Sequence, residues 1–358
     1  MYIYIHIPFC SSICSYCDFP KVLYCQKYVN LYLDNLEAEI LKRYKGEVVK
    51  SIYIGGGTPS SLNTLELKKL LAIIKIFHCE EKIEFTVEAN VESLDEEKIK
   101  ILADNGVNRV SLGVQSFDSA NLVELNRHHS KREVFRVVEV LRRYGIDNIS
   151  VDIIYGVSDD LRVLEADVDA VLALNIPHVS FYSLIIEDNT LFGIRGREYI
   201  SEEVEYLMYS SIEERMLALG YNHYEVSNYS RVGYESVHNI NYWRNGFYYG
   251  FGLGAVSFVE NKRINNTKNL SKYLRGLYQE EEVNEDFERQ VSNALILGLR
   301  MVQGIDVLDF KKRYGVDIRD LYNIRELISD EKLVYDGKNL FIAKKYYYLS
   351  NEILINFV

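Results

Sequence analysis

Residues 6–19 read HIPFCSSICSYCDF and follow an expected strand at residues 2–5. The segment holds three of the five cysteines of the chain, Cys10, Cys14 and Cys17, within eight residues. Thiolates are soft ligands that suit zinc or iron-sulfur clusters. A structural zinc ion and a [4Fe-4S] cluster held entirely by protein each need four ligands. Three cysteines therefore favour a [4Fe-4S] cluster with one iron left open for a small molecule.

Two other interpretations of this loop stay open at this point. A zinc site completed by His6 or Cys25 would be structural. A cluster completed by Cys25 would be closed and suited to electron transfer alone. The iron and zinc contents of anaerobically purified protein separate these cases.

The composition is that of an ordinary globular protein. The 358 residues are 48% hydrophobic, enough for one large core or two modest ones. The formal net charge of −11 argues against nucleic acid as a partner, because phosphate binding needs clustered Lys and Arg. Met1 leads directly into an expected strand and no apolar run is long enough to span a membrane. We therefore expect no signal peptide and a cytoplasmic location.

Two kinds of apolar pattern alternate along the first half of the chain. Short apolar runs indicate strands, and apolar residues at helical spacing indicate helices. The expected strands span residues 2–5, 51–54, 83–89, 109–114, 148–155 and 179–184. The expected helices span residues 26–45, 64–77, 95–105 and 160–175, and two more begin at Ser119 and Ser130. Six strand-helix units in succession predict an α/β fold with a parallel sheet and right-handed crossovers.

Glycine and polar residues gather where these strands end. Residues 55–58 read GGGT, Glu88 ends the third strand, Gln115 follows the fourth, and Asp152 lies in the fifth. Arg127 follows the helix after the fourth strand. Glycines let a ligand approach the backbone, and ligands of parallel sheets sit at the carboxyl ends of the strands. Each residue alone is equally well explained by a turn, a helix cap or a surface ion pair, but the shared location favours a ligand site.

The cysteine loop resembles the signature of the radical S-adenosylmethionine (SAM) superfamily. The resemblance implies that the open iron binds SAM and that the strand-helix units close into a partial (β/α)6 barrel related to the TIM barrel. The SAM contacts that it implies are Gly55, Gly56, Gly57, Thr58, Glu88, Gln115, Arg127 and Asp152. Among these, the glycines would hold the methionyl amino group and Arg127 would clamp the methionyl carboxylate. Glu88 and Asp152 match acidic SAM-contacting positions, and Gln115 matches a contact at a strand end.

Further motifs are similar to those of the coproporphyrinogen dehydrogenase group. They are HIPFC (6–10), YIGGGTPS (53–60), VEAN (87–90), SLGVQSF (111–117) and YEVSNY (224–229). The dehydrogenases of that group have a long segment before the cluster strand and a further cysteine two places after the third. Here the sequence starts nine residues before Cys10, and that place holds Phe19. Both features resemble the heme chaperone branch, the HemW-like proteins.

That branch also has a His-Asn-x-x-Tyr-Trp motif, which appears here as HNINYW at residues 238–243. The resemblance implies heme contacts from His238, Tyr242 and Trp243. An imidazole can ligate heme iron while aromatic rings pack on the macrocycle. A histidine can equally be a buried hydrogen-bonding residue, so both roles stay open for His238.

The C-terminal part has a pattern of its own. We expect a radical SAM barrel at 1–190, an extension with the heme motif at 191–280, and a third domain at 281–358. The acidic run Glu280–Glu282 predicts a solvated linker. Helical spacing follows at residues 286–301, 307–314 and 318–327, and residues 333–342 predict a hairpin. Helices and a hairpin predict an α+β, winged-helix-like domain that contacts protein and not DNA.

Together these features favour a radical SAM heme chaperone that binds a [4Fe-4S] cluster, SAM and heme and delivers heme to acceptor proteins. One alternative is an oxygen-independent coproporphyrinogen III oxidase (dehydrogenase) that makes protoporphyrinogen IX, and another is a structural zinc protein that scaffolds partners. The expected partners are heme, heme-accepting proteins and an electron donor for the cluster. Peripheral membrane association is left open, and neither a catalytic residue nor an oligomeric state is assigned.

Overall fold

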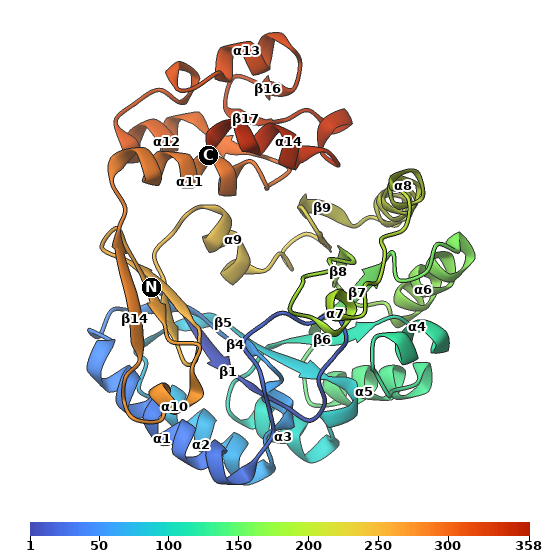
Figure 1. The fold of residues 1–358 in the computed structure, drawn as a ribbon, viewed down its shortest axis with the longest axis vertical. Helices are drawn as coiled ribbons and strands as arrows, with labels where there is room; N and C mark the ends of the chain where they lie inside the picture. Colours follow the sequence, from blue (N-terminus) through green and yellow to red (C-terminus); the bar gives the residue numbers. More distant parts are fainter.

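The computed structural model describes residues 1–358, and its first half is a curved parallel sheet with helices outside it (Figure 1). Six strands lie side by side in chain order and pair in parallel. They are β1 (Tyr2–Ile7), β4 (Val49–Gly56), β5 (Cys79–Asn90), β6 (Arg109–Gln115), β7 (Asn148–Tyr155) and β8 (His178–Ser183). The helices between them are α1 (Gln26–Arg43), α2 (Thr64–Ile74), α3 (Glu96–Asp104), α4 (Ser119–Glu124), α5 (Lys131–Arg143) and α6 (Leu161–Leu174). The predicted α/β partial barrel is confirmed.

Three further strands extend this sheet at its two edges. β11 (Tyr249–Phe251) pairs in parallel with β1, although the two strands are far apart in the sequence. At the other edge, β10 (Asn228–Ser230) pairs antiparallel with β8, and β9 (Asn222–Glu225) pairs antiparallel with β10. The result is a nine-stranded sheet in the order β11-β1-β4-β5-β6-β7-β8-β10-β9. The segment expected as an extension thus contributes strands to the barrel sheet.

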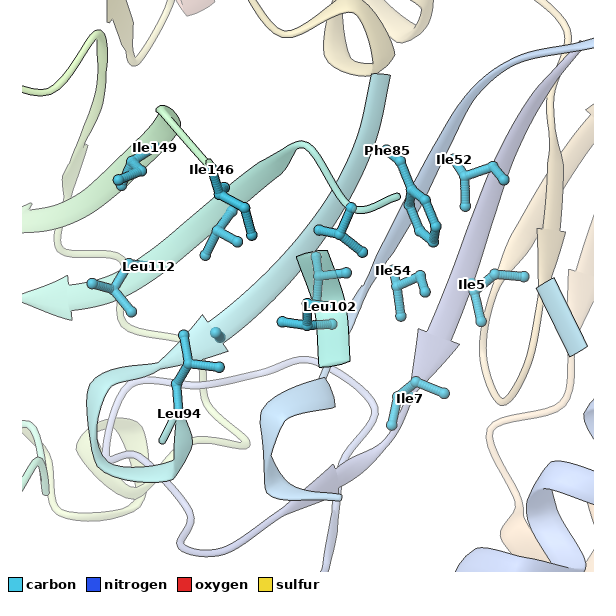
Figure 2. Close-up of a cluster of buried hydrophobic side chains, with 14 of the residues drawn as sticks. Ile5, Ile7, Ile52, Ile54, Phe85, Leu94, Leu102, Leu112, Ile146 and Ile149 are labelled. Atoms are coloured by element: carbon cyan, nitrogen blue, oxygen red, sulfur yellow. The ribbon is translucent and has the colours of Figure 1, made fainter. Parts of the chain in front are cut away.

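The two faces of the sheet carry different chemistry. In β1, Ile3, Ile5 and Ile7 belong to a core of 59 buried residues, which fills the space between the sheet and the helices. Figure 2 shows Ile5 and Ile7 beside Ile52 and Ile54 of β4 in this core. Because successive side chains in a strand point to opposite faces, the residues between these isoleucines face the barrel interior, which we call the lumen. The apolar face therefore stabilises the barrel, and the lumen is free to carry polar groups.

Local signals fix where the outer helices begin. Asn63 caps α2 by accepting hydrogen bonds from the backbone N–H groups of Leu65 and Glu66, and the Glu66 carboxylate accepts one in return from the Asn63 N–H. Ser130 and Glu133 form the same reciprocal capping box at α5. A cap of this kind is worth about 0.5–2 kcal/mol.

A small three-stranded sheet packs beside the barrel, and it corrects one prediction. Its strands are β12 (Val256–Val259), β13 (Lys262–Asn266) and β14 (Gln279–Asn284). Glu280–Glu282, predicted to be a solvated linker, lie in β14, where Glu281 pairs with Asn265 and Glu282 with Ile264. The acidic side chains are solvated because β14 is an edge strand, and charge on an edge strand discourages pairing with other chains.

The C-terminal domain has its own core of 16 buried residues between Val291 and Phe357. Its elements are α11 (Phe287–Gly298), β15 (Ile305–Asp306), α12 (Val307–Tyr314), α13 (Ile324–Ser329), β16 (Leu333–Tyr335), β17 (Asn339–Ile342) and α14 (Ser350–Leu354). The hairpin between β16 and β17 confirms the prediction. The helix predicted at 318–327 is wrong: a 3-10 turn at Ile318–Asp320 is separated from α13 by Leu321, whose backbone is extended, and by Tyr322 at φ 44°. None of the helices is both long and apolar enough to cross a membrane.

Candidate cluster and cofactor site

One cavity of about 390 Å³ brings most of the predicted site residues together at the carboxyl ends of the strands. The predicted residues that line it are Cys10, Cys14, Cys17, Gly56, Gly57, Thr58, Glu88, Gln115, Arg127 and Asp152. They come from the cysteine loop and from β4, β5, β6 and β7, with Arg127 just after α4. The clustering expected from strand order alone is therefore present.

Backbone hydrogen bonds hold the cysteine loop over the strand ends. The two short strands β2 (Phe9–Cys10) and β3 (Val22–Leu23) pair in parallel and close the base of the loop. The Thr58 N–H donates to the Phe9 carbonyl at 2.9 Å, and the Ser15 N–H donates to the Leu125 carbonyl at 3.2 Å. The loop is thus fixed to both the glycine segment and the end of α4.

The Cys10 thiol lies in an environment that disfavours a free thiolate. Burial raises its pKa to about 11, although the Thr58 hydroxyl donates to its sulfur at 3.6 Å. Burial also raises the pKa of Cys17. Because a bound metal centre supplies the positive charge that deprotonates its thiols, three cysteines around one cavity fit a thiolate-bound cluster.

The two proposed fourth ligands are engaged elsewhere or face away. His6 donates from Nε2 to the Pro20 carbonyl at 2.8 Å, so its Nδ1 accepts from the Tyr4 hydroxyl at 3.0 Å. Burial lowers the pKa of His6 to about 4, which keeps the ring neutral. Cys25 is exposed at the start of α1 and is not among the cavity residues. No three His, Cys, Asp or Glu side chains are close enough together to hold a single metal ion such as zinc. This spacing is compatible with a [4Fe-4S] cluster, because each cysteine of such a cluster binds a different iron.

The glycines after β4 have no room for side chains. A Cβ on Gly55 would lie 2.7 Å from the Glu88 carboxyl carbon, and one on Gly56 would lie 2.6 Å from the His6 ring. Gly56 also has φ +116°, which favours glycine. A Cβ on Gly57 would lie 2.7 Å from the Pro8 backbone and 2.9 Å from the Cys10 sulfur. The segment therefore brings bare backbone next to the cluster loop.

Two carboxylates stand in the lumen below the glycines. Glu88 accepts from the Tyr53 hydroxyl at 2.7 Å and from the Gly56 N–H at 3.0 Å. Burial raises the pKa of Glu88 to about 7, against the effect of these hydrogen bonds. Asp152 accepts from the Ser111 hydroxyl at 3.2 Å, and burial also raises its pKa. Both groups are ready to accept hydrogen bonds from ligand hydroxyls.

Gln115 ends β6 in an unusual backbone conformation. Its φ is 72°, and the pairing with β7 shifts register between Gly113 and Gln115. A non-glycine residue in the left-handed region costs of order 1–3 kcal/mol and is found mainly at functional sites. The irregularity turns the Gln115 side chain into the cavity, where its Nε2 would lie 2.9 Å from a Cβ on Gly113.

Arg127 has a partner that the sequence did not reveal. Its Nε and Nη2 donate to the two carboxylate oxygens of Glu92 at 3.0 and 2.8 Å, and Nη2 also donates to the Gly113 carbonyl at 2.8 Å. Glu92 accepts further hydrogen bonds from the His128 N–H and from His129 Nδ1. Burial raises the pKa of Glu92, but the bonds from His129 and Arg127 outweigh it and hold that pKa well below its usual range. Glu92 and Gly113 thus fix the orientation of Arg127 at the cavity wall. Only Nη1 is left to bind a ligand carboxylate, and that role stays a prediction.

The residues of the HNINYW motif do not share one environment. The motif forms α9 (Val237–Trp243), and the Glu84 carboxylate caps it by accepting from the N–H groups of Val237 and His238, both at 2.9 Å. The His238 side chain is fully buried, with Nδ1 2.8 Å from the Ser51 hydroxyl and Nε2 2.9 Å from the Tyr242 hydroxyl. Burial lowers its pKa to about 3. Both nitrogens are occupied, so ligation of a heme iron by His238 would require the ring to leave Ser51 and Tyr242.

Trp243 lines a second cavity, of about 530 Å³, which we call the tyrosine cleft. The cleft lies between the β8–β10 edge of the barrel, α8 (Glu202–Ala218) and the C-terminal domain. Its aromatic wall consists of Tyr155, Phe181, Tyr182, Tyr199, Tyr209, Tyr229, Trp243, Tyr347 and Tyr348. Asn239 of the motif lines both this cleft and the cluster cavity. The motif therefore connects the two cavities through Asn239.

Residues 4–165 match the Radical SAM superfamily, and residues 288–345 match the HemN C-terminal domain. Heme chaperone HemW of Lactococcus lactis is 40% identical over 99% of this chain and 96% of its own length, and that of Bacillus subtilis is 35% identical over 98% and 97%. The chain belongs to the HemW family.

A solved structure of Escherichia coli coproporphyrinogen III oxidase (HemN), a radical SAM enzyme, shares the fold of this HemW family member. The TM-score is 0.88 over 99% of this chain and 89% of that chain, at 20% sequence identity. At this identity the match supports the architecture of the barrel and the C-terminal domain. The match does not distinguish between the possible reactions, which have to be inferred from the site residues and from the family.

Two residues of this HemW site were missed in the sequence. Tyr53 and Glu92 hold Glu88 and Arg127 in place, as described above. Tyr53 lies two residues before Gly55 in β4 and faces the lumen. Because side chains alternate along a strand, its position on the same face as Gly55 could have been predicted from the sequence. Glu92 lies just beyond the end of β5, in a 3-10 turn, and no pattern in the sequence connects it with Arg127.

Proposed function

We propose that this protein is a radical SAM heme chaperone. Cys10, Cys14 and Cys17 would hold a [4Fe-4S] cluster, SAM would bind its open iron, and heme would bind nearby before delivery to an acceptor protein. The observation that carries the proposal is the shared cavity: three cysteines, bare glycine backbone and two hydrogen-bonded carboxylates meet at one end of the barrel. Relatives that cover nearly the whole chain are named heme chaperone HemW.

The residues around the cavity have separate roles in this proposal. Gly56 and Gly57 bring backbone close to the cysteine loop, where SAM would lie against it. Glu88 and Asp152, which both line the cavity, would accept hydrogen bonds from the ribose hydroxyls, and Glu88 is positioned for this by Tyr53. A reduced cluster, when bound, supplies an electron to the sulfonium of SAM. The buried cavity walls would keep water from the reacting centre.

The tyrosine cleft supports the heme part of the proposal. Aromatic side chains offer large flat surfaces on which a planar macrocycle can stack. Trp243 belongs to the motif that resembles the heme-binding motif of the branch, and it faces this cleft. The cleft also shares Tyr182, Ser183, Leu184, Ile185 and Asn239 with the cluster cavity. A heme in the cleft would therefore lie directly beside the cluster site.

The second candidate, coproporphyrinogen oxidation, has less support. At the position where the dehydrogenases of the group have a further cysteine, this chain has Phe19, whose exposed side chain lines the cavity. The structural match to HemN concerns the fold, which both functions share. The zinc scaffold has less support still, because His6 is fully hydrogen-bonded and Cys25 does not reach the site.

One sample tests these functions together. The protein is reconstituted anaerobically with iron and sulfide, and hemin binding is followed by quenching of Trp243, the single tryptophan of the chain. The same sample is then given coproporphyrinogen III, SAM and a reductant. We expect saturable quenching by hemin and no protoporphyrinogen IX. Robust turnover without hemin binding would replace the chaperone with the oxidase, and zinc in place of iron would remove both.

A further inference from the structure

Arg109 is a buried cation with no partner in the protein. It begins β6, its exposed fraction is 2%, and its side chain lines the cluster cavity. Its Nε and Nη1 are both buried without a hydrogen-bond partner, and it forms no ion pair. Burying an unpaired charge normally destabilises a protein by several kcal/mol. Such a group calls for an anion that the protein itself does not provide.

The neighbouring acids do not supply that anion. Glu84, whose charge acts on Arg109 most strongly, uses both carboxylate oxygens to cap α9. Glu88 accepts from Tyr53 and Gly56, and Asp152, whose charge also acts on Arg109, accepts from Ser111 and forms no ion pair with Arg109. Burial lowers the pKa of Arg109, but Glu84 and the other nearby groups outweigh it and raise that pKa, so the guanidinium stays charged.

The two buried histidines at this end of the lumen are satisfied. His238 is bonded to Ser51 and Tyr242, as described above. His178 is bonded in the same way, with Nδ1 2.8 Å from the Ser150 hydroxyl and Nε2 2.8 Å from the Tyr224 hydroxyl. By contrast, Thr86 and Asn148, which flank Arg109 in the strand register, each have a buried side-chain oxygen without a partner. The unsatisfied groups thus form one row across β5, β6 and β7.

Arg109 lies nearer the amino end of the lumen than the expected SAM contacts Glu88 and Asp152, and its positive charge opposes the rise in their pKa values. Gln115 ends β6 and Arg109 begins it, so their backbones stand about 20 Å apart along the strand. Asn239, from the motif that also supplies Trp243 to the tyrosine cleft, lines the same cavity as Arg109. A ligand that reaches Arg109 therefore extends past Glu88 and Asp152 toward the amino end of the lumen.

We propose that Arg109 is an anchor for a carboxylate of the porphyrin, one of its propionate side chains, at the amino end of the lumen. This inference rests on the proposed heme function. A guanidinium binds a carboxylate through two parallel hydrogen bonds, from Nη2 together with either Nε or Nη1, and the protein uses neither Nε nor Nη1 of Arg109. Thr86 and Asn148 lie in the same row and limit the space around it. The iron is not part of this interaction.

The test uses cluster-reconstituted protein and two porphyrins, hemin and hemin dimethyl ester, in which the carboxylates are blocked. In the wild type we expect hemin to bind about 10- to 100-fold more tightly than the ester, the range of a charged hydrogen-bonded contact. Arg109→Met should remove this preference and leave SAM affinity unchanged. Arg109→Lys keeps the positive charge but loses the paired N–H donors of the guanidinium, so it should keep part of the preference for hemin over the ester. Arg162→Met, at an exposed arginine paired with Asp160, is the matched control and should change neither.

Thermal unfolding without porphyrin gives a second readout. Because Met replaces an unpaired buried charge by an apolar chain of similar length, Arg109→Met should melt at the same temperature as wild type or higher. A lower melting temperature with equal loss of both porphyrins would make Arg109 a structural cation and overturn the inference. Loss of SAM binding with hemin binding intact would assign Arg109 to SAM and also overturn it. If wild-type protein binds no hemin, the proposed function itself fails, whereas hemin binding that is indifferent to Arg109 removes only this inference.

Discussion

Polar residues lie at both ends of the lumen, but those at one end are enclosed by the protein and those at the other end face a cavity. At the amino end, His238 and His178 have both ring nitrogens bonded to hydroxyl groups of the protein. At the carboxyl end, the cysteines, the glycine backbone and the carboxylates Glu88 and Asp152 all line a cavity. Residue type alone does not distinguish these ends. What distinguishes them is that the two histidines are enclosed by protein partners, whereas the residues at the carboxyl end face a cavity; the exceptions at the amino end are Arg109 and its neighbours Thr86 and Asn148, which have unpartnered buried atoms.

The largest effect is expected at the open end, from Cys10→Ala. With two of its three thiolates left, the loop should fail to hold the cluster, so iron and sulfide contents after reconstitution should fall close to zero. Cys25→Ala is the matched control because Cys25 is exposed at the start of α1, and its iron content should equal that of wild type. If Cys25→Ala lost iron as well, Cys25 would be a fourth ligand and the site would be closed.

The closed end should respond through stability. His238→Ala leaves the Ser51 and Tyr242 hydroxyls without partners and opens a cavity, so we expect a loss of about 2–4 kcal/mol in the free energy of unfolding. Tyr242→Phe removes a single hydroxyl and should lower that free energy by about 1 kcal/mol. Urea unfolding of both variants measures these values. Hemin affinity should persist in folded His238→Ala; its disappearance with stability unchanged would instead identify His238 as an iron ligand.

The glycine segment should respond through both stability and ligand binding. In Gly57→Ala the new Cβ meets the Pro8 backbone at 2.7 Å, so overpacking should lower stability by about 1–3 kcal/mol and displace the cysteine loop. Gly46→Ala is a useful contrast, because Gly46 has φ +89° but no atom within 4 Å of the added Cβ. It should lower stability by about 1 kcal/mol and keep SAM binding intact. Equal SAM affinities in the two variants would show that space at Gly57 is irrelevant to the cofactor.

The smallest effect is a pH dependence that comes from Glu88. Burial raises its pKa to about 7 from the ordinary 4.5, so between these pH values the folded protein keeps a proton that the unfolded chain has lost. Stability should therefore fall as pH rises through this window. Glu88→Gln cannot ionise and should reduce that fall, as seen in urea unfolding at pH 5 and pH 8. A steeper pH dependence in Glu88→Gln than in wild type would contradict the assignment.

Much of this architecture could be predicted from the sequence, because its signals are local. The strand at 148–155 was placed to the residue, and the helices after the first and second strands were placed to within three residues at each end, since apolar spacing and caps mark their limits. Edge strands were missed because β11 becomes a strand only by pairing with β1. Glu280–Glu282 looked like a linker because the composition of an exposed edge strand resembles that of a loop.

The site was predicted in part for the same reason. The cysteines and the glycine segment are local motifs, and the structure places them around one cavity. The partner of Arg127 is Glu92, and one partner of His238 is Ser51; these pairs are brought together by the fold, and no spacing rule connects them. Arg109 was read as the first residue of a strand, and its isolation is visible only when every neighbour is known.

The pairing of β11 with β1 also has a consequence for how the protein is made. β1 leaves the ribosome long before one of its two neighbours, because that neighbour consists of residues 249–251. Until then, β1 keeps one row of backbone groups unpaired, and the cysteine loop that follows it is attached to an unfinished edge. Contacts this distant in the chain form slowly and leave partly folded species exposed. Loading of a metal centre into this loop should therefore follow synthesis of residues 249–251.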